Sequence, residues 1–258
     1  MEPRLGTVAV FFALSAESGC FEDKLTGLKT FQADGFTLRQ GMFRERDILV
    51  VLTGMGPEKA RHAADAVLQA HKPREVFSAG FAGALTADLA QGQLFFPSEV
   101  CAEALRQITL ENRVQKRAEL PENAHFGGRM VTLSGVAATP EKRQKTAAQY
   151  AAVAADMETF ALAELCTDRG IPFLALRCIS DDVNSAISDD VQKIGEQESF
   201  MAQLGAAMKV AWNRPKSLAE MYRLRENALV ASLALAEALE VLLPPPPMPK
   251  SETEEIIS

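Results

Sequence analysis

The sequence predicts an α/β protein built on a mixed, largely parallel β-sheet that helices cover on both faces. Apolar runs of strand length alternate with helix-like segments from residue 7 to residue 180. The strand candidates are almost continuously apolar, which is typical of strands buried on both faces. The helix-like segments between them have the length that crossovers between parallel strands require.

The first half of the chain begins with an apolar stretch at 7–14, which predicts a buried strand. We prefer this interpretation to a signal peptide, because the stretch is short and no small-residue cleavage site clearly follows it. Ser15 is placed to cap a helix that follows the strand. The further elements expected in this half are a helix over 15–25, strands broken by a turn over 36–54, a helix over 57–72 that begins at Pro57, and strands over 75–80 and 93–100.

The second half continues the alternation as far as residue 180. Pro140 occupies a first-turn position, and Gly170 is a natural helix stop. The expected elements are strands over 129–136, 151–157 and 172–180, and helices over 140–149 and 158–170.

Beyond residue 185 the pattern changes to helices without strands. The sequence predicts one helix over 195–211 and a longer one over 216–243, which carries an apolar band that includes Leu235 and Leu239. Packing on its own domain is the favoured explanation of this band, with a partner helix in an oligomer or a membrane surface as alternatives.

These elements predict one domain followed by a tail. The expected units are a single domain over 1–243 with an extended segment at about 185–225, and a Pro-rich disordered tail over 244–258.

Composition and charge exclude several classes of function. The 258 residues carry a net charge of −7, which argues against a nucleic-acid partner, and no run of 18 uncharged apolar residues predicts a spanning membrane segment. The four cysteines are far apart with mostly small or apolar neighbours, so we expect reduced thiols in a cytoplasmic protein. The three histidines show no metal-ligand spacing. We therefore expect neither a metal nor a cofactor.

Polar residues gather next to the predicted strand ends, where ligands bind in parallel sheets. They are Glu17, the glycine-rich segment at 78–85, Asp156-Met157-Glu158, and Ser180-Asp181. Each has an ordinary structural explanation, since acidic residues suit helix N-termini and glycines suit tight turns. The glycines match neither a dinucleotide fingerprint nor a phosphate-binding P-loop.

Taken together, the segments FFALSAE, SAGFAGAL, ADMETFALAELC and GIPFLALRCISDD resemble the nucleoside phosphorylase/nucleosidase superfamily. The pattern is most similar to that of the methylthioadenosine/S-adenosylhomocysteine nucleosidases. The resemblance runs in order from about residue 7 to residue 184. It implies a three-layer α/β/α sandwich and a homo-oligomer, a dimer or larger, that takes a small-molecule nucleoside.

The resemblance also assigns roles to residues of this chain. Asp181, next to Ser180, corresponds to the acid that faces the N7 side of the purine. Met157 corresponds to the residue that packs on the sugar, and Glu158 to the acceptor of its 2′ and 3′ hydroxyls. Glu17 corresponds to the acid that positions the attacking water in the hydrolytic members.

The same resemblance implies further substrate-binding positions. Arg177 matches an arginine of the last family strand, Ala138 and Thr139 fall where residues line the base, and Gly80 and Phe81 belong to the glycine-rich segment, which we expect to be a loop.

The chemistry suits these residue types. Cleavage of an N-glycosidic bond builds a cationic sugar and negative charge on the leaving base, and a carboxylic acid that protonates the base removes that charge. The apolar neighbours Cys178 and Ile179 are expected to keep Asp181 protonated. Glu158 favours the cationic sugar, and Glu17 can accept a proton from water.

Hydrolysis is favoured over phosphorolysis. Phosphorolytic relatives hold phosphate with arginine and serine side chains around the glycine-rich segment, where this chain has Ser78 and Phe81. A purine (adenine-type) nucleosidase is therefore the main hypothesis, with a phosphorylase or a non-catalytic nucleoside-binding protein as alternatives.

Phe81 also departs from the serine of the methylthioadenosine nucleosidases. Because hopanoid-associated family members have an apolar residue there, a lipid-linked adenosyl substrate is a further hypothesis. The segment at 185–225 would then form a lid or a pocket for the substrate's tail.

Overall fold

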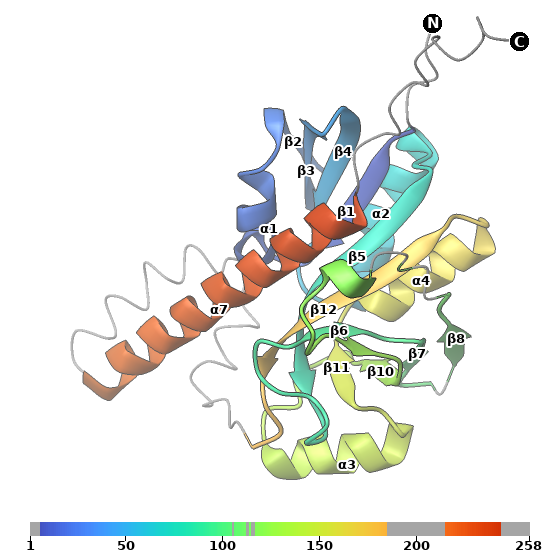
Figure 1. Cartoon of the computed structure of the whole chain (residues 1–258). Helices are drawn as coiled ribbons and strands as arrows, with labels where there is room; N and C mark the ends of the chain where they lie inside the picture. Colours follow the sequence, from blue (N-terminus) through green and yellow to red (C-terminus); the bar gives the residue numbers. More distant parts are fainter. Residues whose placement is uncertain (1–5, 105, 112–113, 115–116, 185–214, 244–258) are drawn as a thin grey trace, which may run out of the picture.

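The computed structural model describes residues 6–104, 106–111, 114, 117–184 and 215–243 (Figure 1), with the side chains of the last range described from residue 226. The predicted helix at 195–211 and the predicted tail at 244–258 lie outside these residues.

The described chain alternates strands and helices. The helices are α1 (Ser15–Glu22), α2 (Pro57–His71), α3 (Pro140–Tyr150), α4 (Thr159–Asp168) and α7 (Pro215–Leu242), with a 3₁₀ turn η1 (Arg117–Glu119). The strands are β1 (Val8–Phe12), β2 (Thr26–Ala33), β3 (Phe36–Phe43), β4 (Arg46–Leu52), β5 (Glu75–Ala84), β6 (Leu94–Phe96), β7 (Glu99–Ala102), β8 (Gln107–Thr109), β9 (His125–Phe126), β10 (Arg129–Thr132), β11 (Ala154–Asp156) and β12 (Phe173–Asp181).

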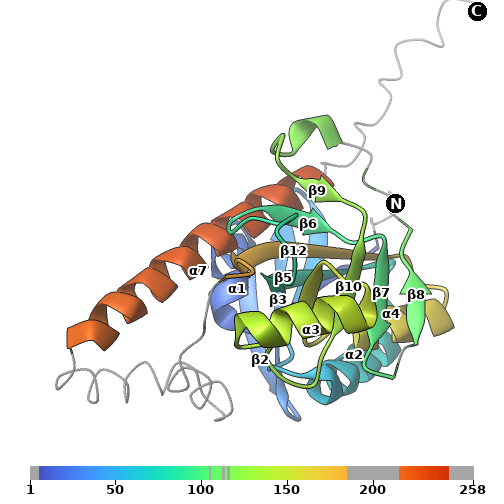
Figure 2. The ribbon, with the colours of Figure 1, turned by 90° about the horizontal axis from the view of Figure 1, so that it is seen from below.

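One mixed sheet organises the molecule. Its main path runs β2-β3-β4-β1-β5-β11-β10-β7-β8, and β12 pairs with β5 and β6. The central pairs β4-β1, β1-β5 and β5-β12 are parallel, whereas β2-β3 and β3-β4 are antiparallel hairpins. The predicted fold class, a mixed and largely parallel sheet with helices on both faces, is confirmed (Figures 1 and 2).

Alternate side chains of the central strands build the two cores. Val10 of β1 belongs to the core that includes Phe21 of α1 and Leu239 of α7. Its neighbour Phe11 belongs to the opposite core, which includes Val67 of α2 and Leu162 of α4. Because neighbouring strand residues point to opposite faces, these two cores account for the continuous apolar runs in the sequence.

Helix α7 packs on its own domain, as the favoured explanation of its apolar band predicted. Leu235 and Leu239 are fully buried against the α1 side of the sheet, and the hydroxyl of Ser232 donates to the carbonyl of Glu17 at 3.0 Å. Within the described residues, no helix is long and apolar enough to cross a membrane.

The sequence does not predict the short elements β8, β9 and η1, and its predictions differ from the structure at further places. Strand β2 was not predicted, because its side chains are exposed along its whole length and show no apolar alternation. Helix α1 ends at Glu22 rather than at residue 25. The segment at 78–85, predicted to be a loop, lies almost wholly in β5, which extends to Ala84.

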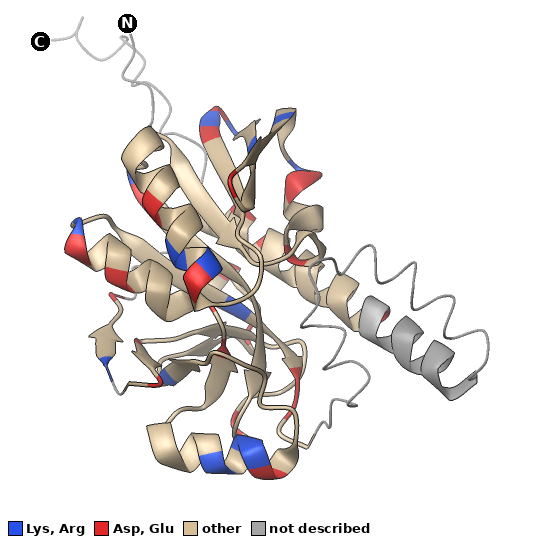
Figure 3. Cartoon of the chain, turned by 180° about the vertical axis from the view of Figure 1, so that it is seen from behind, with Lys and Arg blue, Asp and Glu red and all other residues tan. Residues whose placement is uncertain are grey.

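Charge and thiols follow the composition. Acidic and basic residues are interspersed along the ribbon in Figure 3. All four cysteines are free, and Cys101, Cys166 and Cys178 are buried, as predicted.

Candidate active site

The site lies beside β5, at the point where one edge of this strand changes its neighbouring strand from β1 to β11. That edge pairs in parallel with β1 as far as Ser78 and then in antiparallel with β11 from Gly83. A cavity of about 250 Å³ opens beside the intervening residues, bordered by the ends of β1, β10, β11 and β12. A change of strand partner is where open α/β sheets bind ligands.

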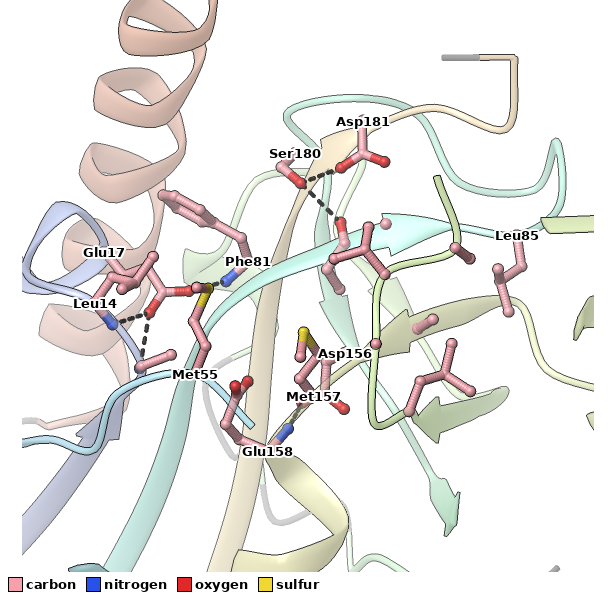
Figure 4. A pocket seen from close by; sticks show the side chains of 18 of the residues that line it. Leu14, Glu17, Met55, Phe81, Leu85, Asp156, Met157, Glu158, Ser180 and Asp181 are labelled. Carbon is pink, nitrogen blue, oxygen red and sulfur yellow. Dashed lines mark hydrogen bonds between the residues drawn. The ribbon is translucent and has the colours of Figure 1, made fainter. Parts of the chain in front are cut away.

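Glu17, in the first turn of α1, is held at this edge by three backbone N–H groups. Its Oε2 accepts from Ala13 and Leu14, both at 2.8 Å, and its Oε1 accepts from Phe81 at 2.8 Å (Figure 4). Burial raises the pKa of Glu17, whereas these hydrogen bonds favour the charged form. The carboxyl group is thus fixed in place, with burial disfavouring its charged form and the three N–H groups favouring it.

Glu158 stands between β11 and α4 and points into the same cavity (Figure 4). Its Oε1 accepts from the backbone N–H of Gly56 at 2.7 Å. Burial, followed by the negative charges of Asp156 and Glu17, raises its pKa to about 8. The environment of Glu158 therefore favours its protonated form.

A second, small cavity of about 10 Å³ is bordered by Glu17, Gly80, Glu158 and Arg177. This volume is at the lower limit for one water molecule. It lies beside β5, where Gly80 leaves room for Glu17, since a Cβ on Gly80 would lie 2.7 Å from Glu17 Oε1.

Asp181, at the end of β12, lines the main cavity on the side opposite Glu17 (Figure 4). Its Oδ1 accepts from the Ser180 hydroxyl, and its Oδ2 accepts from the guanidinium of Arg143 on α3. The prediction that Asp181 has apolar surroundings is therefore wrong. Cys178 and Ile179 are fully buried in two separate hydrophobic clusters, whereas the carboxylate contacts a hydroxyl and a cation.

Arg177 is not placed at the main cavity, contrary to the role that the resemblance implied. Its side chain is 3% exposed and donates to Asp156 Oδ2, Ser78 Oγ and the Ser78 carbonyl, each at 2.8 Å. It borders only the small cavity. Arg177 and Asp156 thus form a buried ion pair that joins β12, β11 and β5.

The residues predicted to line the base are also displaced. Ala138 is buried, and the Thr139 hydroxyl caps α3 by accepting from the Lys142 N–H at 3.2 Å. The main cavity is bordered instead by the preceding residues, Gly135 to Ala137. The segment after β10 turns into α3 at Thr139, so Gly135 to Ala137, rather than Ala138 and Thr139, border the cavity.

The other predicted residues lie where expected. Met157, Phe81 and Ser180 border the main cavity, and Gly80 borders the small one. Sequence reasoning missed Arg143 and the apolar wall residues Met55 and Leu133. Arg143 lies 38 positions before Asp181, and only the packing of α3 brings the two together. Among the described residues, no group of three or more His, Cys, Asp or Glu side chains is arranged to hold a metal ion.

Known proteins are similar to this chain in sequence and in fold. The chain is 23% identical over 198 residues to the 5′-methylthioadenosine/S-adenosylhomocysteine nucleosidase of Staphylococcus aureus (strain JH9), with 69% of this chain and 87% of that protein covered.

Solved structures of such nucleosidases superpose on most of the chain. The enzyme from Neisseria meningitidis, in complex with methylthio-immucillin-A, gives a TM-score of 0.67 at 18% identity and covers 91% of this chain and 99% of its own. The enzyme from Colwellia psychrerythraea, in complex with adenine, gives 0.69 at 20% identity and covers 92% and 96%. The family model described as the phosphorylase superfamily matches residues 7–112 and 101–211, and this chain therefore belongs to that superfamily.

Proposed function

We propose that the protein is a purine nucleosidase that hydrolyses the bond between an adenine-type base and ribose. The observation that carries this proposal is the placement of three carboxyl groups, Glu17, Glu158 and Asp181, from three different elements around one cavity (Figure 4). The similarity to enzymes named as methylthioadenosine/S-adenosylhomocysteine nucleosidases supports the same substrate class.

Glu158 and Met157 form the proposed sugar site. The two ribose hydroxyls donate to the Glu158 carboxylate, and Met157 packs against the ring. As the C–N bond breaks, positive charge develops on the sugar, and an opposite charge nearby favours the ionised form of a carboxyl group. The positive charge on the sugar therefore favours the carboxylate form of Glu158 and counteracts the effect of burial on its pKa. The attraction between sugar and carboxylate strengthens as the C–N bond breaks.

Glu17 is the proposed acceptor of the water proton. It borders both the main cavity and the small one, so a water in the small cavity lies between Glu17 and the sugar site. The raised pKa of Glu17 makes its carboxylate a stronger base than an exposed glutamate.

Asp181 is the proposed acid at the base. It gives its proton to a ring nitrogen of the leaving purine, which removes the negative charge that the departing base would otherwise carry. The Ser180 hydroxyl has one hydrogen and two acceptors, Asp181 Oδ1 and the Ala82 carbonyl at 3.3 Å. It can donate to either one and so follow the change in protonation of Asp181.

The cations near the site favour water over phosphate as the nucleophile. Among the described residues, the arginines that border the two cavities are Arg143 and Arg177, and both are paired with aspartates. A phosphate dianion needs charged donors. The small cavity beside Glu17 is also far smaller than a phosphate ion.

Base release with and without phosphate tests the proposal. We expect purified protein to release free adenine from methylthioadenosine, adenosylhomocysteine, 5′-deoxyadenosine or a lipid-linked analogue in phosphate-free buffer. We expect Asp181→Asn to lower the rate by roughly 10²–10⁴-fold, since it removes general-acid help.

Asp168→Asn, an exposed position at the end of α4, is the matched control and should keep the wild-type rate. Base release that depends strictly on phosphate would replace the proposal by the phosphorylase alternative. Nucleoside binding in a thermal-shift assay without any base release would support the non-catalytic alternative.

The remaining expectations are proposals of the same kind. The apolar cavity residues Leu14, Met55 and Phe81 support an apolar substituent on the nucleoside. We also propose that the protein is cytoplasmic and forms a homo-oligomer. Sedimentation of the purified chain would test the oligomeric state.

A further inference from the structure

Arg143 is a buried cation whose hydrogen bonds all lead to the wall of the site. It comes from α3 and is 1% exposed. Its Nη1 donates to the carbonyls of Ala84 at 3.0 Å and Asp182 at 3.1 Å, which lie at the ends of β5 and β12, and its Nη2 donates to Asp181. Arg143 therefore ties α3 to β5 and to β12, the strand that carries the proposed acid.

The pair is arranged with Asp181 in front and Arg143 behind. The Asp181 side chain is 21% exposed, whereas that of Arg143 is 2% exposed. The two carboxylate oxygens have different partners, since Oδ2 accepts from Arg143 and Oδ1 accepts from Ser180. A guanidinium can only donate, whereas a hydroxyl can donate or accept. Oδ2 thus always accepts from Arg143. The Ser180 hydroxyl can instead switch from donor to acceptor when Oδ1 carries a proton.

Gly83 provides the space in which the pair lies. A Cβ at this position of β5 would lie 3.0 Å from Asp181 Oδ2 and 3.2 Å from Arg143 Nη1. Both contacts are too close for a side chain to be added without displacing the pair. The second glycine of the segment SAGFAGAL therefore accommodates the Arg143–Asp181 contact, as the first accommodates Glu17.

Anchoring of α3 alone does not account for a buried arginine here. The Arg143 Nε has no hydrogen-bond partner among the described residues, and a buried unpaired donor is unfavourable. An apolar side chain would join α3 to the sheet without that cost. The residue type is better explained by what it does to Asp181.

We propose that Arg143 is the positioning residue for base protonation, because it holds Oδ2 so that Oδ1 exchanges the proton with the leaving base. This inference rests on the proposed function. The proton passes from Asp181 Oδ1 to a ring nitrogen of the purine as the C–N bond breaks and its electron pair goes to the base. The water oxygen bonds to the sugar carbon, and the water proton goes to Glu17. Once the base has left, Glu17 gives its proton to solvent and solvent protonates Asp181 again.

Two substrates separate positioning of the acid from a purely structural role. Purine release needs protonation of the base, whereas 4-nitrophenyl β-D-ribofuranoside has a leaving group that departs without it. We expect Arg143→Met to lower kcat for nucleoside hydrolysis by about 10²-fold, the effect of misplacing a reacting group, with KM little changed. We expect the rate of 4-nitrophenol release to be retained. Arg143→Lys should recover part of the loss, because lysine keeps the charge but not the fork of donors.

Arg129→Met is the matched control. Arg129 also pairs with a carboxylate, that of Glu99 at 2.9 Å, and also anchors α3, by donating to the Tyr150 carbonyl at 2.9 Å. It does not border the cavity, so this variant should keep both activities. A second variant, Gly83→Ala, leaves every charge in place and displaces the pair, so it should reproduce the selective loss of purine release even where Arg143→Met does not fold.

The outcomes are distinct. Equal losses on both substrates, or an unchanged kcat with purine nucleosides, would overturn the role of Arg143. Wild-type protein that releases no base from any nucleoside would contradict the proposed function itself, before any variant is compared.

Discussion

At the scale of single residues, the site is a set of carboxyl groups that the fold keeps in unequal environments. Glu17 accepts from three backbone N–H groups, Glu158 accepts from one, and Asp181 accepts from a hydroxyl and a guanidinium. Each carboxyl group thus has a different set of donors, which suits the separate roles proposed for the three groups.

Glu158 links the site to stability. Its pKa in the folded protein is about 8, above the ordinary value of 4.5, so the folded state binds more protons than the unfolded state between these values. Stability that this group contributes at low pH is therefore lost as pH rises through about 8. We expect Glu158→Gln to raise the Tm of the protein without nucleoside at pH 9. The rise should be roughly 2–4 °C for each kcal/mol that the variant adds to the free energy of unfolding.

Thermal melts of both proteins from pH 5 to pH 9 check this prediction. The gap between variant and wild type should widen as the pH rises. Because burial also raises the pKa of Glu17, part of the fall in stability should remain in the variant. The exposed Glu122→Gln is the control and should follow the wild type. A constant gap across this range would contradict the raised pKa of Glu158.

At the scale of elements, β5 joins the two halves of the site. The sequence predicts the first half of β5 correctly, whereas its prediction of a loop for SAGFAGAL is wrong. In the structure the segment remains extended, and the glycines leave room for acidic side chains that approach the strand. The distinction was not available from the sequence, because the acids that approach Gly80 and Gly83 come from remote positions, Glu17 and Asp181.

Gly80→Ala tests this use of the strand. The added Cβ would lie 2.7 Å from Glu17 Oε1, so we expect displacement of Glu17 and a fall in the hydrolysis rate of about 10²-fold. The measurement is kcat for base release in phosphate-free buffer.

Gly19→Ala is the matched control, since a Cβ there meets nothing within 4 Å and Gly19 lies inside α1. It should keep the activity and stabilise the protein by roughly 0.5–1 kcal/mol through helix propensity. Full activity of the Gly80 variant would show that Glu17 does not need its present position.

At the scale of the whole molecule, the last helix completes the core on the α1 side of the sheet. Leu235 and Leu239 of α7 are fully buried there, whereas Leu233 is 47% exposed. Since the Ser232 hydroxyl also bonds to the Glu17 carbonyl, α7 braces the helix that carries the proposed base.

We expect Leu235→Ala to lower the free energy of unfolding by about 2–5 kcal/mol, the usual cost of a cavity at a buried leucine. Leu233→Ala should change it by less than about 0.5 kcal/mol, because that side chain is half exposed. Urea denaturation monitored by circular dichroism measures both. Equal effects at the two positions would contradict the observed packing of α7.

The sequence by itself determined the sheet, most of its strands and the three carboxyl positions. These features depend on apolar periodicity and on motifs that are contiguous in the chain, such as Asp156-Met157-Glu158 and Ser180-Asp181. Only the tertiary structure decided the partners of those groups. Arg177 pairs with Asp156 and does not border the main cavity, and Arg143 contacts Asp181 from α3. The residues before Ala138 and Thr139 border the cavity in their place. The physical reason is that a charge's environment is set by side chains that come close only when helices pack on the sheet, and the spacing of residues along one chain does not specify those contacts.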